Sequence, residues 1–237
     1  MTNELLELIS QLPLFESLPR SLVKKTLNGT LPMVVPRGKS IALQGDRAGS
    51  LAIVLNGLIK VYRLFPEGKE ITIRLMQDGD VVLTDLGRVG DISYNENYEV
   101  IRDANVIFIG KAHLQACMAE HPELAMAMLS VVHTQAQCLA DEITLVKWQY
   151  LPQRVASFLA GLDPEGSGAV KVRLPYEKTL LAARLGASRE SLSRAFAELR
   201  AIGVNVQNMV VAIDDLDRLR EFSETSSHDL RTRCEGK

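Results

Sequence analysis

The sequence predicts an α+β protein in which an antiparallel β-rich half precedes one long helix and a smaller, mainly helical half. Three observations support this order. Residues 33–110 contain short β-branched runs with a period of two, separated by turn-forming residues. Residues 122–148 repeat apolar side chains with the period of a packed helix. Residues 180–200 form two short helical segments separated by a glycine. A chain of 237 residues is long enough for two domains.

The composition is that of a globular protein with a local excess of positive charge. The chain is 46% hydrophobic and 24% charged, so it can bury extensive cores. Its net charge is −2, but residues 149–203 carry 8 basic and 5 acidic side chains, a net charge of +3. Contacts with phosphate groups are therefore expected in that segment.

The sequence also predicts a cytoplasmic location. No run approaches the roughly 18 apolar residues of a membrane-spanning helix. The first ten residues carry acids where a secretory signal carries bases. Three widely spaced cysteines form neither a disulfide framework nor a metal-binding pair.

The first half is expected to begin with short helices over residues 4–28, interrupted by prolines, and to continue as strands. Glycines at intervals of 11 or 12 residues are typical of short antiparallel strands joined by tight turns in a sandwich or barrel. These are Gly45, Gly57, Gly68 and Gly79.

Residues 122–148 are expected to form one helix, about 40 Å long. Apolar residues follow an unbroken alternation of four- and three-residue steps over three heptads, the pattern of a two-stranded coiled coil. The alternative is a helix buried on its own β-rich domain. The members of this heptad seam are Ala125, Leu129, Val132, Ala136, Leu139, Ile143 and Val146.

Residues 180–200 predict a helix–turn–helix. Gly186 ends the first helix and Ser188 caps the second, because a serine hydroxyl can accept an unpaired backbone N–H. One face of the second helix carries the apolar residues Leu192, Ala195, Phe196 and Leu199. The opposite face, about 200° away, carries Glu190, Ser193, Arg194 and Ala197. Two short strands over residues 204–214, with a turn at Gln207-Asn208, follow as a wing.

The polar face suits the major groove of DNA. An arginine fork can pair with guanine, a carboxylate can accept from cytosine, and serine can contact either kind of group. The stretch SRESLSR resembles the DNA-binding end of the cyclic-AMP receptor protein/FNR family of bacterial transcription regulators. The family motif E-x-x-S-R matches Glu190, Ser193 and Arg194, preceded by a phosphate-contacting serine and an arginine at Ser188 and Arg189.

The resemblance implies a homodimer joined through residues 122–148, in which each subunit contacts one half-site of the TTGAT type. It also implies contact with RNA polymerase, as expected of an activator, although the sequence leaves activation and repression both open. The fold it implies is a cyclic-nucleotide-binding-like β-roll, a dimerisation helix and a winged helix–turn–helix. The corresponding boundaries are 1–121, 122–148 and 149–222, followed by a flexible tail over 223–237.

The effector is less constrained by the sequence. LNGLIKVYRLFPEGKE is similar to the β-roll of the Dnr or Nnr branch, which implies a response to nitric oxide through haem. Cyclic-nucleotide binding is disfavoured, because Tyr94-Asn95 stands where the family's phosphate-binding Arg-Ser pair is expected. Residues 85–87 echo the ribose-binding segment only in part, and Arg88 is several residues away from the pair.

The cysteines and histidines bear on two cofactors, an iron–sulfur cluster and haem. An iron–sulfur cluster is disfavoured because no cysteine precedes Cys117, and three cysteines cannot supply four ligands. The candidate haem ligands are His113, His121 and His133, each of which has a structural alternative as a helix-capping, interfacial or solvated residue.

No nucleophile–base pair, phosphate-binding glycine loop or metal-ligand spacing indicates an enzyme. The remaining alternatives are a cyclic-nucleotide-responsive regulator and one that acts without an effector.

Overall fold

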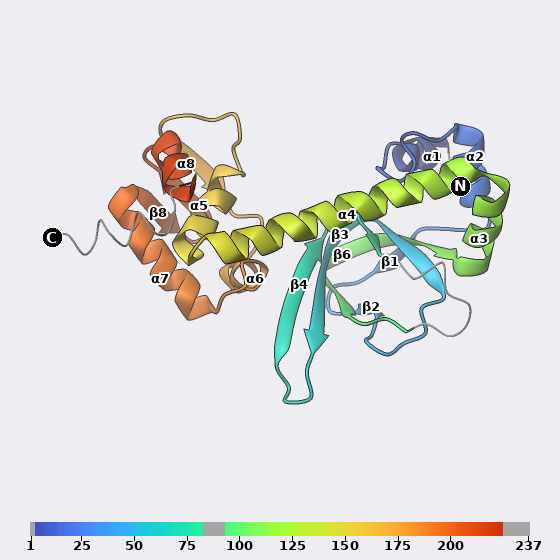
Figure 1. Cartoon of the computed structure of the whole chain (residues 1–237), viewed down its shortest axis with the longest axis horizontal. Coiled ribbons are helices and arrows are strands. Elements are labelled where there is room, and N and C mark those ends of the chain that lie inside the picture. Colours follow the sequence, from blue (N-terminus) through green and yellow to red (C-terminus); the bar gives the residue numbers. More distant parts are fainter. Residues whose placement is uncertain (1–2, 83–92, 225–237) are drawn as a thin grey trace. The chain divides into compact units, whose positions relative to one another are not determined.

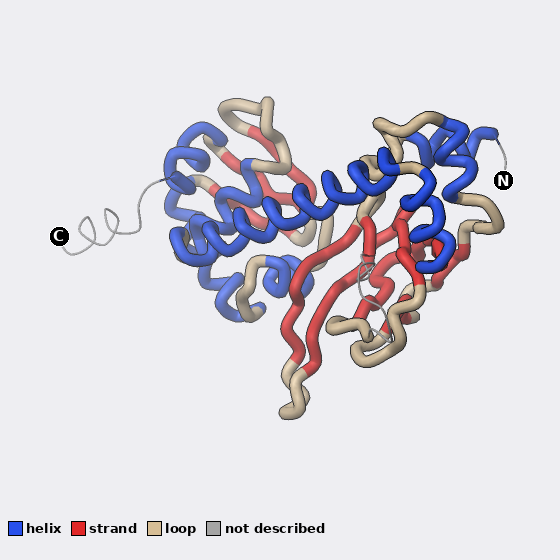
Figure 2. The backbone as a smooth tube through the Cα atoms, turned by 45° about the vertical axis from the view of Figure 1, so that its right-hand side comes forward, coloured by secondary structure: helices blue, strands red, loops and turns tan. Residues whose placement is uncertain are grey.

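The computed structural model describes residues 3–82 and 93–224 of the chain (Figures 1 and 2). The chain divides into two compact units, Met1–Gln137 and Cys138–Lys237. The boundary falls inside the helix α4 (Pro122–Trp148), which spans the residues predicted from the sequence. Among the described residues, no helix combines the length and apolar content needed to cross a membrane.

The first unit is built around an antiparallel sheet, which confirms the predicted β-roll (Figure 1). Its longest strands, β3 (Ser50–Leu64) and β6 (Asn97–Gly110), pair with each other along nearly their whole length. In the described part of the chain the sheet has six strands in the order β1-β6-β3-β4, with β2 paired to β6 and β5 to β3. The shorter strands are β1 (Met33–Val35), β2 (Ser40–Ala42), β4 (Glu70–Met76) and β5 (Val81–Val82).

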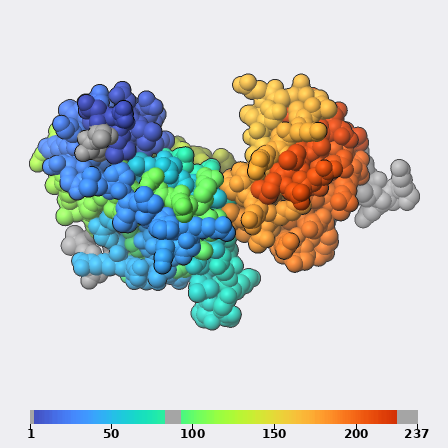
Figure 3. Space-filling view, turned by 180° about the vertical axis from the view of Figure 1, so that it is seen from behind, coloured from blue at the N-terminus to red at the C-terminus, as the bar shows by residue number. Residues whose placement is uncertain are grey.

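Gly57 differs from the turn position that its spacing predicted. It lies inside β3, where the pairing with β6 shifts register on both sides of Asn56. Its φ is +126°, and a Cβ there would lie 2.5 Å from the Cβ of Ala104. The close approach of β6 requires a residue without a side chain, so this glycine marks a β-bulge. Gly68 does lie in a turn, between β3 and β4, whose hairpin extends beyond the rest of the sheet (Figures 1 and 3).

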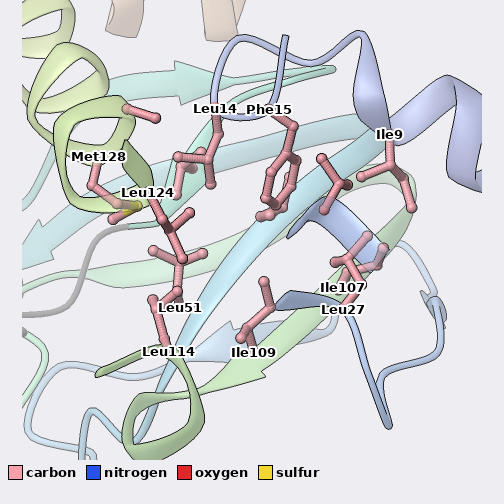
Figure 4. Close-up of a cluster of buried hydrophobic side chains, with 14 of the residues drawn as sticks. Ile9, Leu14, Phe15, Leu27, Leu51, Ile107, Ile109, Leu114, Leu124 and Met128 are labelled. Carbon is pink, nitrogen blue, oxygen red and sulfur yellow. The ribbon is translucent and has the colours of Figure 1, made fainter. Parts of the chain in front are cut away.

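Helices close one side of this unit over an apolar core (Figure 4). The N-terminal helices α1 (Asn3–Ser10) and α2 (Arg20–Thr26) fall within the predicted helical stretch. Helix α3 (Lys111–Glu120) follows β6 directly, and α4 follows α3 after His121. The fully buried side chains at the centre come from all of these elements, from the α1–α2 connection and from the sheet. They include Ile9, Phe15, Leu27, Leu51, Ile107, Leu114 and Leu124.

The second unit holds the predicted winged helix–turn–helix. After α5 (Leu151–Ala160) and β7 (Val170–Arg173) come α6 (Lys178–Arg184), α7 (Arg189–Leu199) and a short 3₁₀ helix, η1 (Arg200–Ile202). The wing strands β8 (Val204–Gln207) and β9 (Val210–Ile213) pair with each other, and β9 also pairs with β7. Helix α8 (Leu216–Glu224) follows.

Two details of this unit depart from the sequence prediction. The wing turn consists of Asn208 and Met209, one residue later than expected, because Gln207 pairs with Val210. Asn208 has a φ of +55°, a left-handed conformation that asparagine tolerates. At the C-terminus, Ser223 and Glu224 belong to α8, and residues 225–237 of the expected tail lie outside the described residues.

Candidate nucleic-acid interface

The turn between α6 and α7 has the geometry that its residues predict. The N–H of Gly186 bonds to the carbonyl of Ala183 at 3.1 Å, and the N–H of Ala187 bonds to the carbonyl of Ala182 at 2.9 Å. This pair of bonds, with a φ of +65° at Gly186, is the Schellman ending of a helix. Two residues later the Ser188 hydroxyl accepts the N–H of Ser191 at 3.1 Å and so caps α7.

Helix α7 buries the predicted stripe and exposes the predicted polar face. Leu192, Ala195, Phe196 and Leu199 are all buried. The five candidate contact residues are all exposed, so they form one accessible surface on the first two turns of the helix and at its cap. They are Ser188, Arg189, Glu190, Ser193 and Arg194.

Glu190 is ionised at neutral pH on this surface. Its carboxylate accepts a hydrogen bond from its own backbone N–H and one from the Ser188 hydroxyl, and both lower its pKa. The nearby positive charges of Arg189 and Arg194 lower the pKa further. A carboxylate held in this state is an acceptor, which is the role that contact with a cytosine amino group requires.

Two exposed arginines outside α7 are further candidates for phosphate contacts, and neither belongs to a recognisable motif. Arg173 lies at the end of β7, opposite Val210 and beside the wing turn, where the N–H of Leu174 bonds to the carbonyl of Met209 at 2.8 Å. Arg184, in the last turn of α6, lies over the rings of Phe158 and Tyr176 at 5.9 and 5.8 Å. Both arginines are exposed. The signal that could have found them is the net charge of +3 over residues 149–203.

Helix α4 has two distinct apolar faces. One face of its first half is buried in the core of the first unit, through Leu124, Ala127, Met128 and Val131. The predicted heptad seam lies on another face, where its larger members are 44–60% exposed in a single chain. These are Leu129, Val132, Leu139, Ile143 and Val146. A continuous exposed apolar stripe of this kind marks a protein–protein contact.

The structure describes only some of the residues that correspond to a cyclic-nucleotide site in the first unit. Residues 85–87 and Arg88 lie outside the described residues. Tyr94, at the predicted position of the phosphate-binding pair, donates from its hydroxyl to the carbonyl of Ser50 at 3.2 Å. It also packs edge-on against Tyr98, with 5.6 Å between ring centroids. Burial raises the pKa of both phenols, that of Tyr98 to about 12, so both stay neutral, and neither supplies the positive charge that the arginine of the family's pair offers to an anionic ligand.

Two of the three candidate haem ligands, His113 and His121, are engaged with residues of α2, and both contact Lys25. The Nε2 atom of His113 lies 3.2 Å and 3.1 Å from the carbonyl oxygens of Lys25 and Thr26 in α2. His121 ends α3, with its Nε2 3.1 Å from the Nζ of Lys25 and its Nδ1 3.4 Å from Glu123. His133 is exposed on α4. Iron ligation by His113 or His121 would require these contacts to break.

Comparisons with known proteins place both units in known families of domains. Residues 32–121 match the cyclic nucleotide-binding domain, and residues 153–222 match the Crp-like helix-turn-helix domain. The chain is 29% identical over 200 residues to the cyclic AMP receptor protein of Thermus thermophilus, covering 81% of this chain and 87% of that one. It is 22% identical over 218 residues to the CRP-like cAMP-activated global transcriptional regulator of Mycobacterium tuberculosis, covering 90% and 97%.

A solved structure shares the architecture. It is a protein of Ruegeria pomeroyi DSS-3, provisionally described as cyclic nucleotide-binding, with 30% identity and a TM-score of 0.62. The match covers 95% of this chain and the whole of that one.

Proposed function

Because the chain belongs to the CRP family of transcription regulators, with a cyclic nucleotide-binding domain and a Crp-like helix–turn–helix domain, we propose that it is a homodimeric, effector-controlled regulator that binds a palindromic DNA site of the TTGAT type. Its relatives are regulators rather than enzymes. The observation that carries the proposal is the exposed polar surface of α7 over a buried apolar stripe.

Each of the five candidate contact residues has a role that its chemistry supports. Arg194 and Arg189 contact guanine or phosphate, Glu190 accepts from cytosine, and Ser193 contacts a base edge. Ser188 contacts phosphate as well as capping the helix: its hydroxyl oxygen accepts the N–H of Ser191, and its single proton, which faces Ser191 Oγ and the Glu190 carboxylate in the free protein, turns to a phosphate oxygen.

The dimer forms through residues 122–148. Two exposed seams, packed against each other, remove their apolar side chains from water, and the 27-residue helix is long enough for three heptads. In the resulting dimer the two α7 helices contact half-sites one helical turn apart, about 34 Å. A regulator that binds chromosomal DNA in this way acts in the cytoplasm, and if it activates transcription it contacts RNA polymerase.

The β-roll controls DNA binding by sensing a small effector. An effector that binds one arrangement of the dimer more tightly than another shifts the population towards it. The names of two relatives refer to cyclic AMP, which favours a cyclic nucleotide as the effector. The β-roll stretch that resembles nitric-oxide regulators favours haem, although the contacts of His113 and His121 oppose it. Control by abundance, without an effector, is the third possibility.

The test compares wild-type protein and Arg194→Ala by fluorescence anisotropy on a duplex that carries TTGAT and its inverted repeat. We expect the variant to bind that duplex more weakly by at least about 5- to 150-fold, since one bidentate base contact is worth about 1–3 kcal/mol and the dimer loses one in each half-site. The matched control is Arg218→Ala, which removes an exposed arginine from α8. Equal affinity of Arg194→Ala and wild type for the duplex would refute the assignment.

The same assay identifies the effector. Protein is titrated with cyclic AMP, with cyclic GMP, and with haem followed by nitric oxide under anaerobic conditions. A cyclic-nucleotide sensor binds the palindrome more tightly in the first two series. A haem sensor shows a stoichiometric Soret band that shifts with nitric oxide, together with tighter DNA binding. Affinity that is unchanged in every series favours the effector-independent regulator.

A further inference from the structure

The junction between α4 and α5 contains an unusual concentration of buried polar groups. Five polar or charged residues are buried in the described part of the chain, and three of them meet here: Gln149, Gln153 and Ser223. An amide side chain is costly to bury unless its groups are hydrogen-bonded. The junction must therefore be held by specific contacts, and the proposed base contacts of α7 use none of these residues.

Gln149, the first residue after α4, is bonded to both neighbouring helices. Its Nε2 donates to the carbonyl of Ser223 in α8 at 2.8 Å, and it lies 3.1 Å from the hydroxyl oxygen of Ser157 in α5. Its backbone carbonyl accepts from the Nη1 of Arg154 at 2.8 Å. The end of α4 is thus tied to α5 and α8 by directional bonds in addition to apolar packing.

Tyr150, the next residue, extends these contacts to α7. Its backbone N–H donates to the Oε1 of Gln153 at 3.3 Å, and the Nε2 of Gln153 donates to the carbonyl of Phe222 at 3.3 Å. Its ring packs edge-on against Phe222, with 6.2 Å between centroids. Its hydroxyl donates to the Oε1 of Glu198, in the last turn of α7, at 2.9 Å. Within two residues, the chain therefore passes from the end of α4 to a contact with α7.

We propose that Tyr150 is a positioning residue for DNA recognition: by bonding to Glu198 it fixes the orientation of α7 relative to the α4–α5 junction. This inference rests on the DNA-binding function proposed above. Glu198 lies in the last turn of α7, beyond the base-contacting residues of the first two turns, and its carboxylate already accepts from the Tyr150 hydroxyl, so its role is structural rather than a DNA contact. The buried side-chain amide of Gln153 accepts the backbone N–H of Tyr150 and so holds that backbone in place. The phenol of Tyr150 in turn holds the C-terminal end of α7, which is the end away from the base-contacting residues.

A small change in the tilt of α7 affects its DNA contacts unequally. Hydrogen bonds to base edges need a defined distance and direction, whereas phosphate contacts fix position and supply affinity without sequence information. Loss of the Tyr150–Glu198 bond should therefore reduce the preference for the palindrome more than it reduces general DNA affinity.

The test measures this preference as the ratio of affinities for the TTGAT palindrome and for a random duplex of equal length. Tyr150→Phe removes the donor and keeps the ring against Phe222. Glu198→Ala removes the acceptor, and Glu198→Gln keeps the Oε1 acceptor without the charge. The ratio cancels any general gain in affinity that comes from losing a negative charge. Tyr62→Phe, in the first unit, controls for loss of a phenolic hydroxyl.

We expect Tyr150→Phe and Glu198→Ala to lower the ratio by about three- to tenfold, the effect of one hydrogen bond to an ionised acceptor at a partly exposed site. Glu198→Gln and Tyr62→Phe should leave it near the wild-type value. The double variant Tyr150→Phe/Glu198→Ala should be no worse than either single variant, because both remove the same bond.

The outcomes separate this inference from the function on which it rests. If wild-type protein prefers the palindrome and Tyr150→Phe keeps the full ratio, the positioning role is wrong and DNA recognition stands. The same conclusion follows if Tyr150→Phe lowers both affinities equally together with the melting temperature, because that is a purely structural effect. If wild-type protein shows no preference for the palindrome, the proposed function itself fails.

Discussion

Truncating one side chain of the exposed α4 seam should weaken the dimer by an amount that can be worked from its exposure. Leu139 is 44% exposed in a single chain. Complete burial of a leucine side chain is worth about 2 kcal/mol, so seam pairing gains about 0.9 kcal/mol at Leu139 in each subunit. Leu139→Ala removes up to this gain from both subunits, about 1.8 kcal/mol in total, which raises the dimer dissociation constant by up to about 20-fold.

The same helix offers a matched control for this prediction. Leu145 is 39% exposed but lies outside the heptad seam. Sedimentation equilibrium over a range of protein concentrations measures the dissociation constants of wild type, Leu139→Ala and Leu145→Ala. We expect Leu139→Ala, but not Leu145→Ala, to have a higher dissociation constant than wild type. The melting temperature of the dissociated chain should be the same in all three proteins. Equal dissociation constants for the two variants, or a larger effect at Leu145, would refute dimerisation through this face.

Three further predictions concern stability. Gly57→Ala should destabilise the protein by about 2 kcal/mol or more in denaturant unfolding, because its φ is +126° and the new Cβ would meet Ala104; an unchanged midpoint would contradict the bulge. Ser188→Ala should cost about 1 kcal/mol in the same assay through loss of the α7 cap, and Ser188→Gly only a few tenths; equal losses would argue against capping. Burial raises the pKa of Tyr98 above its unfolded value of 10 to about 12. The folded state therefore retains a proton that the unfolded state loses, so this contribution to stability is complete below pH 10 and is lost as the pH rises towards 12. Tyr98→Phe should remove that part of the alkaline loss, and an identical alkaline profile for variant and wild type would contradict it.

The helix–turn–helix could be predicted almost residue by residue. Its capping serine, its terminating glycine and its four buried apolar positions are local features, governed by bonds and spacings within about one helical turn. The structure confirms each of them at Ser188, Gly186 and the stripe of α7. The exposure of the five candidate contact residues follows from the same helical period.

Long-range contacts could not be predicted in the same way. Gly57 has the spacing of a turn glycine, and only the approach of Ala104 from a strand some 47 residues away in the chain makes it a bulge. The contact of Tyr150 with Glu198, like that of Gln149 with Ser223, joins residues far apart in the sequence. A glutamine or tyrosine near a helix end carries no periodic signal, so nothing in the sequence marks it as buried or paired.

The most direct test of the central claim is hydroxyl-radical footprinting of the protein on a duplex that carries TTGAT and its inverted repeat. A dimer that inserts one α7 helix into each half-site should protect two patches centred about one helical turn, 10 base pairs, apart. Arg194→Ala should lose both patches at protein concentrations where wild type protects them. A single patch, or uniform weak protection that does not depend on the TTGAT sequence, would contradict sequence-specific recognition by a dimer.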